Sequence, residues 1–148
     1  MQSTSLDKFP LKWRWTVKEY CILSDNELKQ ITPLAPSSAK VVWEKSLTFI
    51  DKSKDFSANP ELFQVISTID SKDIEKASNW LKKYLVGSKV IVSWQPDTAV
   101  LTNTELFIRN WDEFCYPASD DVTIYPEDES WVLHYWHEEE FCYARKIV

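Results

Sequence analysis

The chain of 148 residues contains a single glycine, and this scarcity excludes several kinds of ligand site. P-loops, dinucleotide-binding turns and nucleophile elbows each use several glycines, because their backbone approaches a ligand closely or adopts a positive φ. None of these motifs can be drawn in this sequence. We therefore predict that the protein holds no nucleotide cofactor.

Cysteine and long apolar runs are scarce as well. The three cysteines, Cys21, Cys115 and Cys142, are odd in number and have no C-x-x-C spacing, which argues against a disulfide framework and a zinc site. They are expected to be buried thiols. No run approaches the roughly 18 apolar residues of a membrane span, and the N-terminus lacks the basic and apolar regions of a signal peptide. These features predict a cytoplasmic protein without a metal and without membrane association.

The composition is that of an ordinary folded domain, with 44% hydrophobic and 27% charged residues and a high content of 8 tryptophans. A chain of this length forms one hydrophobic core. We therefore expect a single globular domain over residues 1–148.

In the N-terminal half, capping residues and apolar spacing predict one strand and four helices. Alternation over 11–17 predicts a half-buried strand with Trp13, Trp15 and Val17 on one face. Ser24 and Glu27 form a capping box that begins a short helix running to about Ile31. The other three predicted helices cover residues 36–50, 62–69 and 72–85, the last capped by Asp70-Ser71 and ended by Gly87 as a left-handed C-cap.

The C-terminal half changes to the period of strands. A hairpin is predicted from Lys89–Trp94 and Thr98–Thr102, followed by a helix that starts at Asn103 or Thr104 and ends before Pro117. Three strands follow as a meander, at 122–125, 131–136 and 141–147. The predicted fold class is therefore α+β, an antiparallel sheet (hairpin plus C-terminal meander) packed with about four to five helices.

Charge is distributed unevenly along the chain. The net charge is −6, but residues 1–111 carry 13 acids and 15 bases, whereas residues 112–148 carry 10 acids and 2 bases. A phosphate backbone requires a clustered basic surface, so the sequence argues against a nucleic-acid partner. The acidic C-terminal quarter favours a basic protein partner instead.

The acidic segments near the final strands are the candidate docking surface. The Asp120 loop and the Glu138 turn are expected to share one end of the meander, with aromatic anchors beside them. The predicted partner-binding residues are Asp120, Asp121, Glu138, Glu139, Glu140, Trp136 and Tyr116. Neighbouring acids could instead be solvated turns, or carboxylate pairs for glycosidase-like catalysis.

Two histidines allow a chemical alternative. His134 and His137 are three residues apart on a predicted strand, so their side chains point to opposite faces and do not share a metal ion. Either one, beside a carboxylate, could act as a general base in a pocket lined by tryptophan. The alternative is that neither has a chemical role, with His134 packed on a sheet face and His137 placed in a hairpin turn. Cys115 ends a helix beside Asp112 and Glu113, where a thiolate is disfavoured.

Two stretches carry a resemblance to a known class of protein. Residues 111–126, WDEFCYPASDDVTIYP, and 131–141, WVLHYWHEEEF, resemble the C-terminal signature of small bacterial immunity proteins of contact-dependent inhibition and related polymorphic toxin systems. Such proteins are small, often acidic and cytosolic. They neutralise a toxin domain by binding it, which implies a binding protein and not an enzyme.

The leading expectation is therefore an immunity protein that binds a cognate toxin domain, for example a basic nuclease, through its acidic surface. The alternative from the residues is a small enzyme or ligand-binding protein that uses a pocket lined by Trp and His. A third class, a scaffold subunit, predicts an exposed apolar patch.

Overall fold

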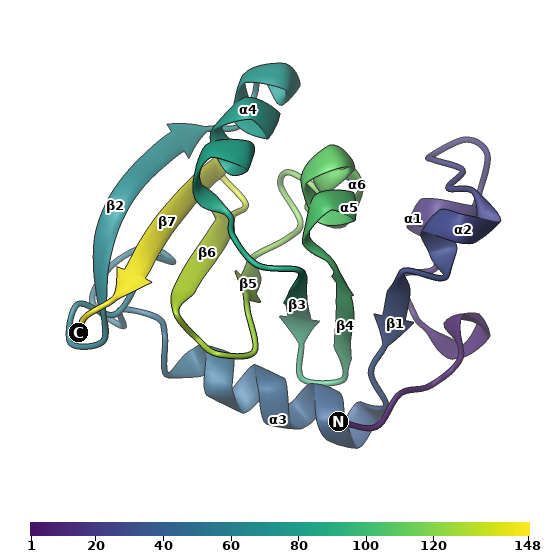
Figure 1. The fold of residues 1–148 in the computed structure, drawn as a ribbon, viewed down its shortest axis with the longest axis horizontal. Helices are drawn as coiled ribbons and strands as arrows, with labels where there is room; N and C mark the ends of the chain where they lie inside the picture. The colour runs from purple at the N-terminus through teal and green to yellow at the C-terminus, as the bar shows by residue number, and fades with distance from the viewer.

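A computed structural model describes all residues, 1–148, and shows an α+β fold built on one seven-stranded antiparallel sheet. Figure 1 shows the strands side by side in the order β1-β4-β3-β5-β6-β7-β2, with β2 and β1 at the two edges. The strands are β1 Ile31–Pro33, β2 Phe63–Asp70, β3 Lys89–Gln95, β4 Thr98–Asn103, β5 Val122–Tyr125, β6 Trp131–Trp136 and β7 Glu140–Lys146. The predicted hairpin, meander and fold class are confirmed.

Helices cover both faces of the sheet. They are α1 Trp13–Thr16, α2 Asp25–Leu28, α3 Pro36–Leu47, α4 Ile74–Tyr84, α5 Thr104–Arg109 and α6 Trp111–Phe114, with a 3-10 turn at Leu6–Lys8. The α3 helix packs against β3 and β4 on one face, and α4 to α6 cover the other. The sheet is therefore the middle layer of three.

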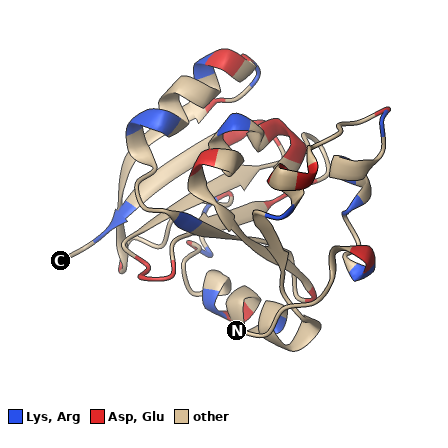
Figure 2. Ribbon diagram, turned by 45° about the vertical axis from the view of Figure 1, so that its right-hand side comes forward, with Lys and Arg blue, Asp and Glu red and all other residues tan.

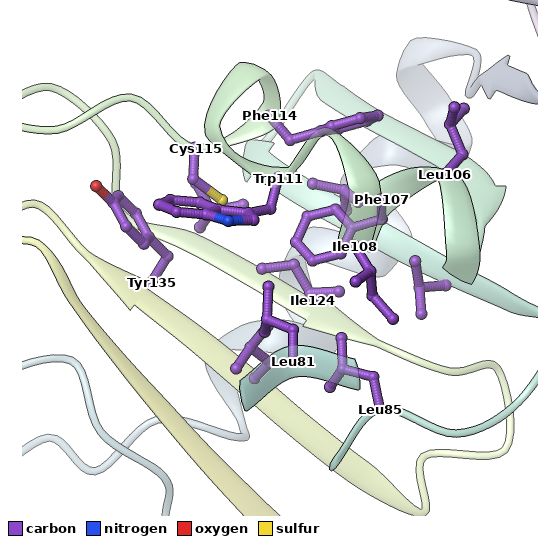
Figure 3. Close-up of a cluster of buried hydrophobic side chains, with 14 of the residues drawn as sticks. Leu81, Leu85, Leu106, Phe107, Ile108, Trp111, Phe114, Cys115, Ile124 and Tyr135 are labelled. Carbon is purple, nitrogen blue, oxygen red and sulfur yellow. The ribbon is translucent and has the colours of Figure 1, made fainter. Parts of the chain in front are cut away.

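The larger core lies between the sheet and α4 to α6. Figure 3 shows Ile124 of β5 between Leu81 and Leu85 of the α4 region on one side and Phe107 and Trp111 on the other. The predicted inward face of β6, Trp131, Leu133 and Tyr135, belongs to this core. The alternate residues of β6 point to the other face of the sheet, where Val132 belongs to the smaller core under α3. The alternation of β6 was therefore predicted correctly.

The predicted strand at 11–17 is wrong, because this segment forms a turn and α1. In a helical turn Arg14 and Trp15 both point inward, and both are buried. The Trp15 ring stacks on that of Phe9 with ring centres 5.6 Å apart, and its centre lies 5.0 Å from the centre of the Phe114 ring. Tertiary packing of these rings overrides an alternation that is too short to specify a strand.

The predicted helix at 62–69 is also wrong, because this segment is the edge strand β2. The Asn59 side chain accepts a hydrogen bond from Glu61 N, which makes a local turn where a helix start was expected. β-Branched residues follow, and β2 pairs with β7 along its length. Pairing with a strand about 75 residues away in sequence decides this element.

Several boundaries differ from the predicted ones. The capping box of Ser24 and Glu27 is present, but α2 ends at Leu28 and the next residues form β1. Asp73, not Asp70-Ser71, caps α4 by accepting from Lys76 N. Gly87 has φ +101, yet the helix ends at an extended Leu85, so Gly87 supports the loop before β3 and is not the C-cap.

Removing the Phe114 ring should destabilise the fold strongly. Phe114 is fully buried among Trp15, Trp94 and Phe107. We expect Phe114→Ala to lower the free energy of unfolding by about 3–5 kcal/mol in urea denaturation. Val41→Ala, at a side chain that is 65% exposed on α3, is the control and should change it by less than about 0.5 kcal/mol. Equal effects of the two substitutions would contradict this packing.

Candidate functional site

Acidic side chains from three distant segments meet at one end of the sheet. The β6–β7 turn, the end of β2 and the start of β5 all lie there, because neighbouring strands are antiparallel. The acidic end consists of Asp70, Asp121, Glu138, Glu139 and Glu140. The short helix α6 carries further acidic residues, which Figure 2 colours red.

Hydrogen bonds hold these segments together. The N–H and the hydroxyl of Ser71 both donate to Glu139 O, at 2.8 and 2.9 Å, and so tie the end of β2 to the turn. His137 N donates to Asp121 Oδ1 at 2.9 Å, and His137 Nδ1 lies 3.0 Å from the same oxygen. The expected proximity of the Asp120 loop and the Glu138 turn is therefore confirmed.

The acidic end has little cationic compensation. Lys72 Nζ lies 3.9 Å from Asp70 Oδ2, and no other Lys or Arg lies within 4.0 Å of the five carboxylates. The side chains of Asp121 and Glu138 are 45% and 63% exposed. Such an array gives a negative local potential that attracts a basic surface.

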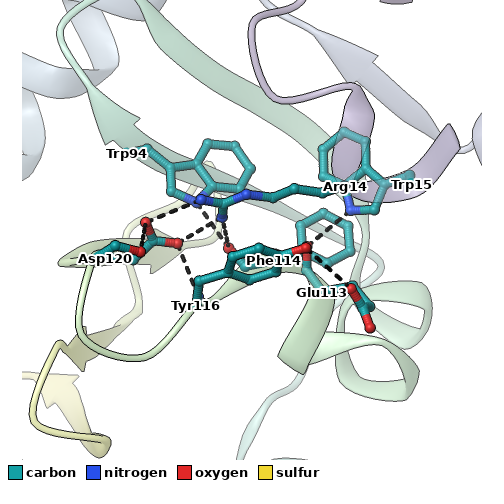
Figure 4. Close-up of polar contacts among 8 residues, drawn as sticks. Arg14, Trp15, Trp94, Glu113, Phe114, Tyr116 and Asp120 are labelled. Carbon is teal, nitrogen blue, oxygen red and sulfur yellow. Dashed lines mark hydrogen bonds and ion pairs between the residues drawn. The ribbon is translucent and has the colours of Figure 1, made fainter. Parts of the chain in front are cut away.

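Asp120 does not belong to this surface, which corrects the prediction. It is buried and forms a bidentate pair with Arg14, with distances of 2.6 and 3.2 Å. Figure 4 shows the pair, with Asp120 also accepting from Tyr116 N at 2.9 Å. Arg14 additionally donates to Phe114 O. Nothing in the sequence signals this pairing, because the partners are 106 residues apart.

Tyr116 and Trp136, the two predicted anchors, are both partly buried. The Arg14 guanidinium lies 3.9 Å from the centre of the Tyr116 ring, so one face of that ring is occupied. Burial and the nearby Glu113 raise the pKa of Tyr116 to about 12. Trp136 stands beside the turn and its ring lies 5.4 Å from that of His137. Only Trp136 presents a partly free ring beside the acidic end.

The two histidines lie in different environments, as the strand geometry predicted. His137 belongs to the β6–β7 turn, whereas His134 points to the α3 face of the sheet and is 1% exposed. Burial lowers the pKa of His134 to about 3, so the imidazole is neutral near pH 7 and a poor general base. Neither of its ring nitrogens has a hydrogen-bond partner.

His134 and Trp136 line the same pocket, which is the feature that the ligand-binding alternative predicts. This pocket has a volume of about 840 Å³ and lies between β2, β6, β7 and the loop 51–57. Phe56 of that loop covers His134, with ring centres 4.9 Å apart. Sequence reasoning missed Phe56, because it sits in a polar loop without a motif.

Burial disfavours the thiolate form of all three cysteines. Cys115 is fully buried. Its pKa is raised well above the usual value, mainly by burial and secondly by the negative charge of Asp120. Cys142 is buried as expected, whereas Cys21 is only half-buried. Burial raises the pKa of both thiols. No group of three or more His, Cys, Asp or Glu side chains is arranged to hold a metal ion.

Comparisons with known proteins give one family. The family model described as "Protein of unknown function (DUF2947)" matches residues 3–141. Neither the curated proteins nor the solved structures contain a match to this chain. Among the helices of the structure, none combines the length and apolar character needed to cross a bilayer.

Breaking the Arg14–Asp120 pair should be costly. Asp120→Ala leaves a buried guanidinium without a counter-charge, and we expect the free energy of unfolding to fall by about 3–5 kcal/mol. The double variant Arg14→Met/Asp120→Ala removes both charges and should lose less than the sum of the single variants. Lys45→Ala, which breaks the partly exposed Lys45–Glu129 pair, is the control and should cost under about 1 kcal/mol. If the losses of unfolding free energy in the two single variants add up to the loss in the double variant, the two side chains do not interact energetically.

The buried His134 should make stability depend on pH. Its pKa is lowered to about 3 in the folded protein, against about 6.5 when unfolded, so between these values the unfolded chain binds the extra proton. The free energy of unfolding should therefore fall as pH decreases from about 6.5, by at most about 1.4 kcal/mol per pH unit. Urea denaturation of wild type and His134→Phe at several pH values measures this contribution as the difference in slope. Identical slopes would refute it.

Proposed function

The chain belongs to the DUF2947 family, whose model covers most of its length, and we propose that it is an immunity protein that neutralises a toxin domain by binding it. One structural observation carries the proposal: three distant segments place five acidic residues at one end of the sheet, and Lys72 is the only Lys or Arg within 4.0 Å of their carboxylates. The resemblance of residues 111–126 and 131–141 to immunity proteins supports the same assignment.

The acidic end suits a basic toxin surface such as that of a nuclease domain. Long-range attraction would raise the rate of encounter, and Trp136 would bury its free ring against the toxin. The protein would block the active site or the substrate-binding surface of the toxin by occupancy. It would perform no reaction of its own in the cytoplasm, so affinity decides how well it protects the cell.

The docking residues are revised from those expected from the sequence. Asp121, Glu138, Glu139, Glu140 and Trp136 remain in the proposed surface. Asp120 is buried below this surface, where it pairs with Arg14. The Tyr116 ring stacks on the same guanidinium, so both residues hold the neighbouring loop in place and do not contact the partner themselves. Asp70 joins the surface, since β2 ends beside the turn.

The test is a survival assay followed by binding kinetics. A toxin domain encoded beside this protein is expressed in a sensitive host with and without it, and survival is expected only when both are present. Stopped-flow kinetics of the purified pair should then show association slowing as salt rises from about 0.05 to about 0.5 M.

Charge reversal locates the surface. Glu138→Lys/Glu139→Lys should slow association at low salt by about tenfold or more and change dissociation less. Glu44→Lys/Glu61→Lys makes the same change in net charge at exposed positions away from the acidic end, and it should leave association near the wild-type rate. Equal slowing by both double variants would mean that only net charge matters and would remove the acidic end as the docking surface.

A further inference from the structure

The pocket beneath the loop 51–57 contains a buried polar group that nothing in the protein satisfies. His134 forms its floor, between its cross-strand neighbours Thr123 and Cys142. The side chain is 1% exposed, and both ring nitrogens lack a hydrogen-bond partner. A buried imidazole without partners lowers stability, and such groups persist where function requires them.

The cover over His134 is itself strained. Phe56 lies 4.9 Å from the imidazole with the ring planes at 57°. Its φ of +21 is in the region that favours glycine, and a bulky residue there costs about 1–3 kcal/mol. The ends of the loop are held by the Ile50–Ala58 bridge and by Asp51 N donating to Ser57 O at 2.8 Å. Displacement of Phe56 therefore requires movement only of the residues between these two attachment points.

The chemistry of the lining restricts what can replace Phe56. A neutral imidazole presents either an N–H donor or a nitrogen acceptor, according to its tautomer, so it suits an uncharged polar atom. Trp136 offers a flat apolar ring at the wall. Lys52 and Lys54 are balanced by Asp55 and Glu140, so the lining has no excess charge to select an ion.

We propose that this pocket binds a neutral, flat nitrogen heterocycle of the nucleobase type, which displaces Phe56, stacks on Trp136 and forms a hydrogen bond with His134. The pocket volume of about 840 Å³ is within the range of small-molecule sites. Small-molecule binding here goes beyond toxin binding and does not rest on it, although Trp136 and Glu140 belong to both the pocket and the proposed docking surface. Glu138 and Glu139, which the charge-reversal test changes, lie outside the pocket.

The two histidines of the chain make a direct test simple, because their ring nitrogens give separate 15N NMR signals and His137 lies outside the pocket. Adenine and uracil are titrated as probes, with toluene as a flat control that has no polar atom. We expect saturable shifts of the His134 nitrogens with at least one base, no matching shift of the His137 nitrogens, and no effect of toluene. A toluene shift equal to that of the bases would mean an unspecific apolar cavity and would overturn the proposal.

Variants of the cover and the wall sharpen the test. Phe56→Gly removes the ring and relieves the positive φ, so it should tighten binding of the responding base by about tenfold, since the open state no longer has to be selected. Trp136→Leu should weaken binding by about tenfold, whereas Trp43→Leu, at a half-buried tryptophan of α3 outside the pocket, should not. If neither base shifts the His134 nitrogens in the Phe56→Gly protein, where the ring stands uncovered, the site is not a heterocycle site.

Discussion

The buried ion pair between Arg14 and Asp120 holds together parts of the chain that no strand pairing connects. Arg14 comes from α1, and Asp120 from the loop that leads into β5. The same guanidinium contacts Phe114 O and the Tyr116 ring, so the end of α6 and the loop after it are fixed around one charge. Because Asp121 directly follows Asp120 and accepts from His137 N, the geometry of the acidic end depends on this pair.

The two faces of the sheet have different roles. The face under α4 to α6 is packed by large aromatic and aliphatic side chains and forms most of the core. The α3 face has a smaller core, and beyond the end of α3 the polar loop 51–57 replaces the helix as the cover. A tightly packed face tolerates little change, whereas a face covered by a loop can open. The pocket and the unpaired His134 lie on the second face.

The acidic end and the pocket are adjacent but chemically different. Carboxylates at the strand ends are solvated and act at long range, which suits recognition of a charged protein surface. The pocket recognises shape and uncharged polar atoms at short range, because its histidine is neutral and its charges balance. Glu140 lies at both, since β7 begins at the acidic end and its first residue lines the pocket.

Local patterns in the sequence determined the capping box of α2, the helices α3 and α4, the hairpin and the meander, because capping side chains, turns and apolar periodicity act over a few residues. They also determined which side of β6 belongs to the core and that His134 and His137 lie in different environments. Tertiary structure decided the segments 11–17 and 62–69, where ring packing and pairing with β7 outweighed local preference. It also decided that Asp120 is buried beside Arg14, that Asp70 joins the acidic end and that Phe56 covers His134. These contacts join residues far apart in the chain, and their energies depend on distances that exist only after the sheet has formed.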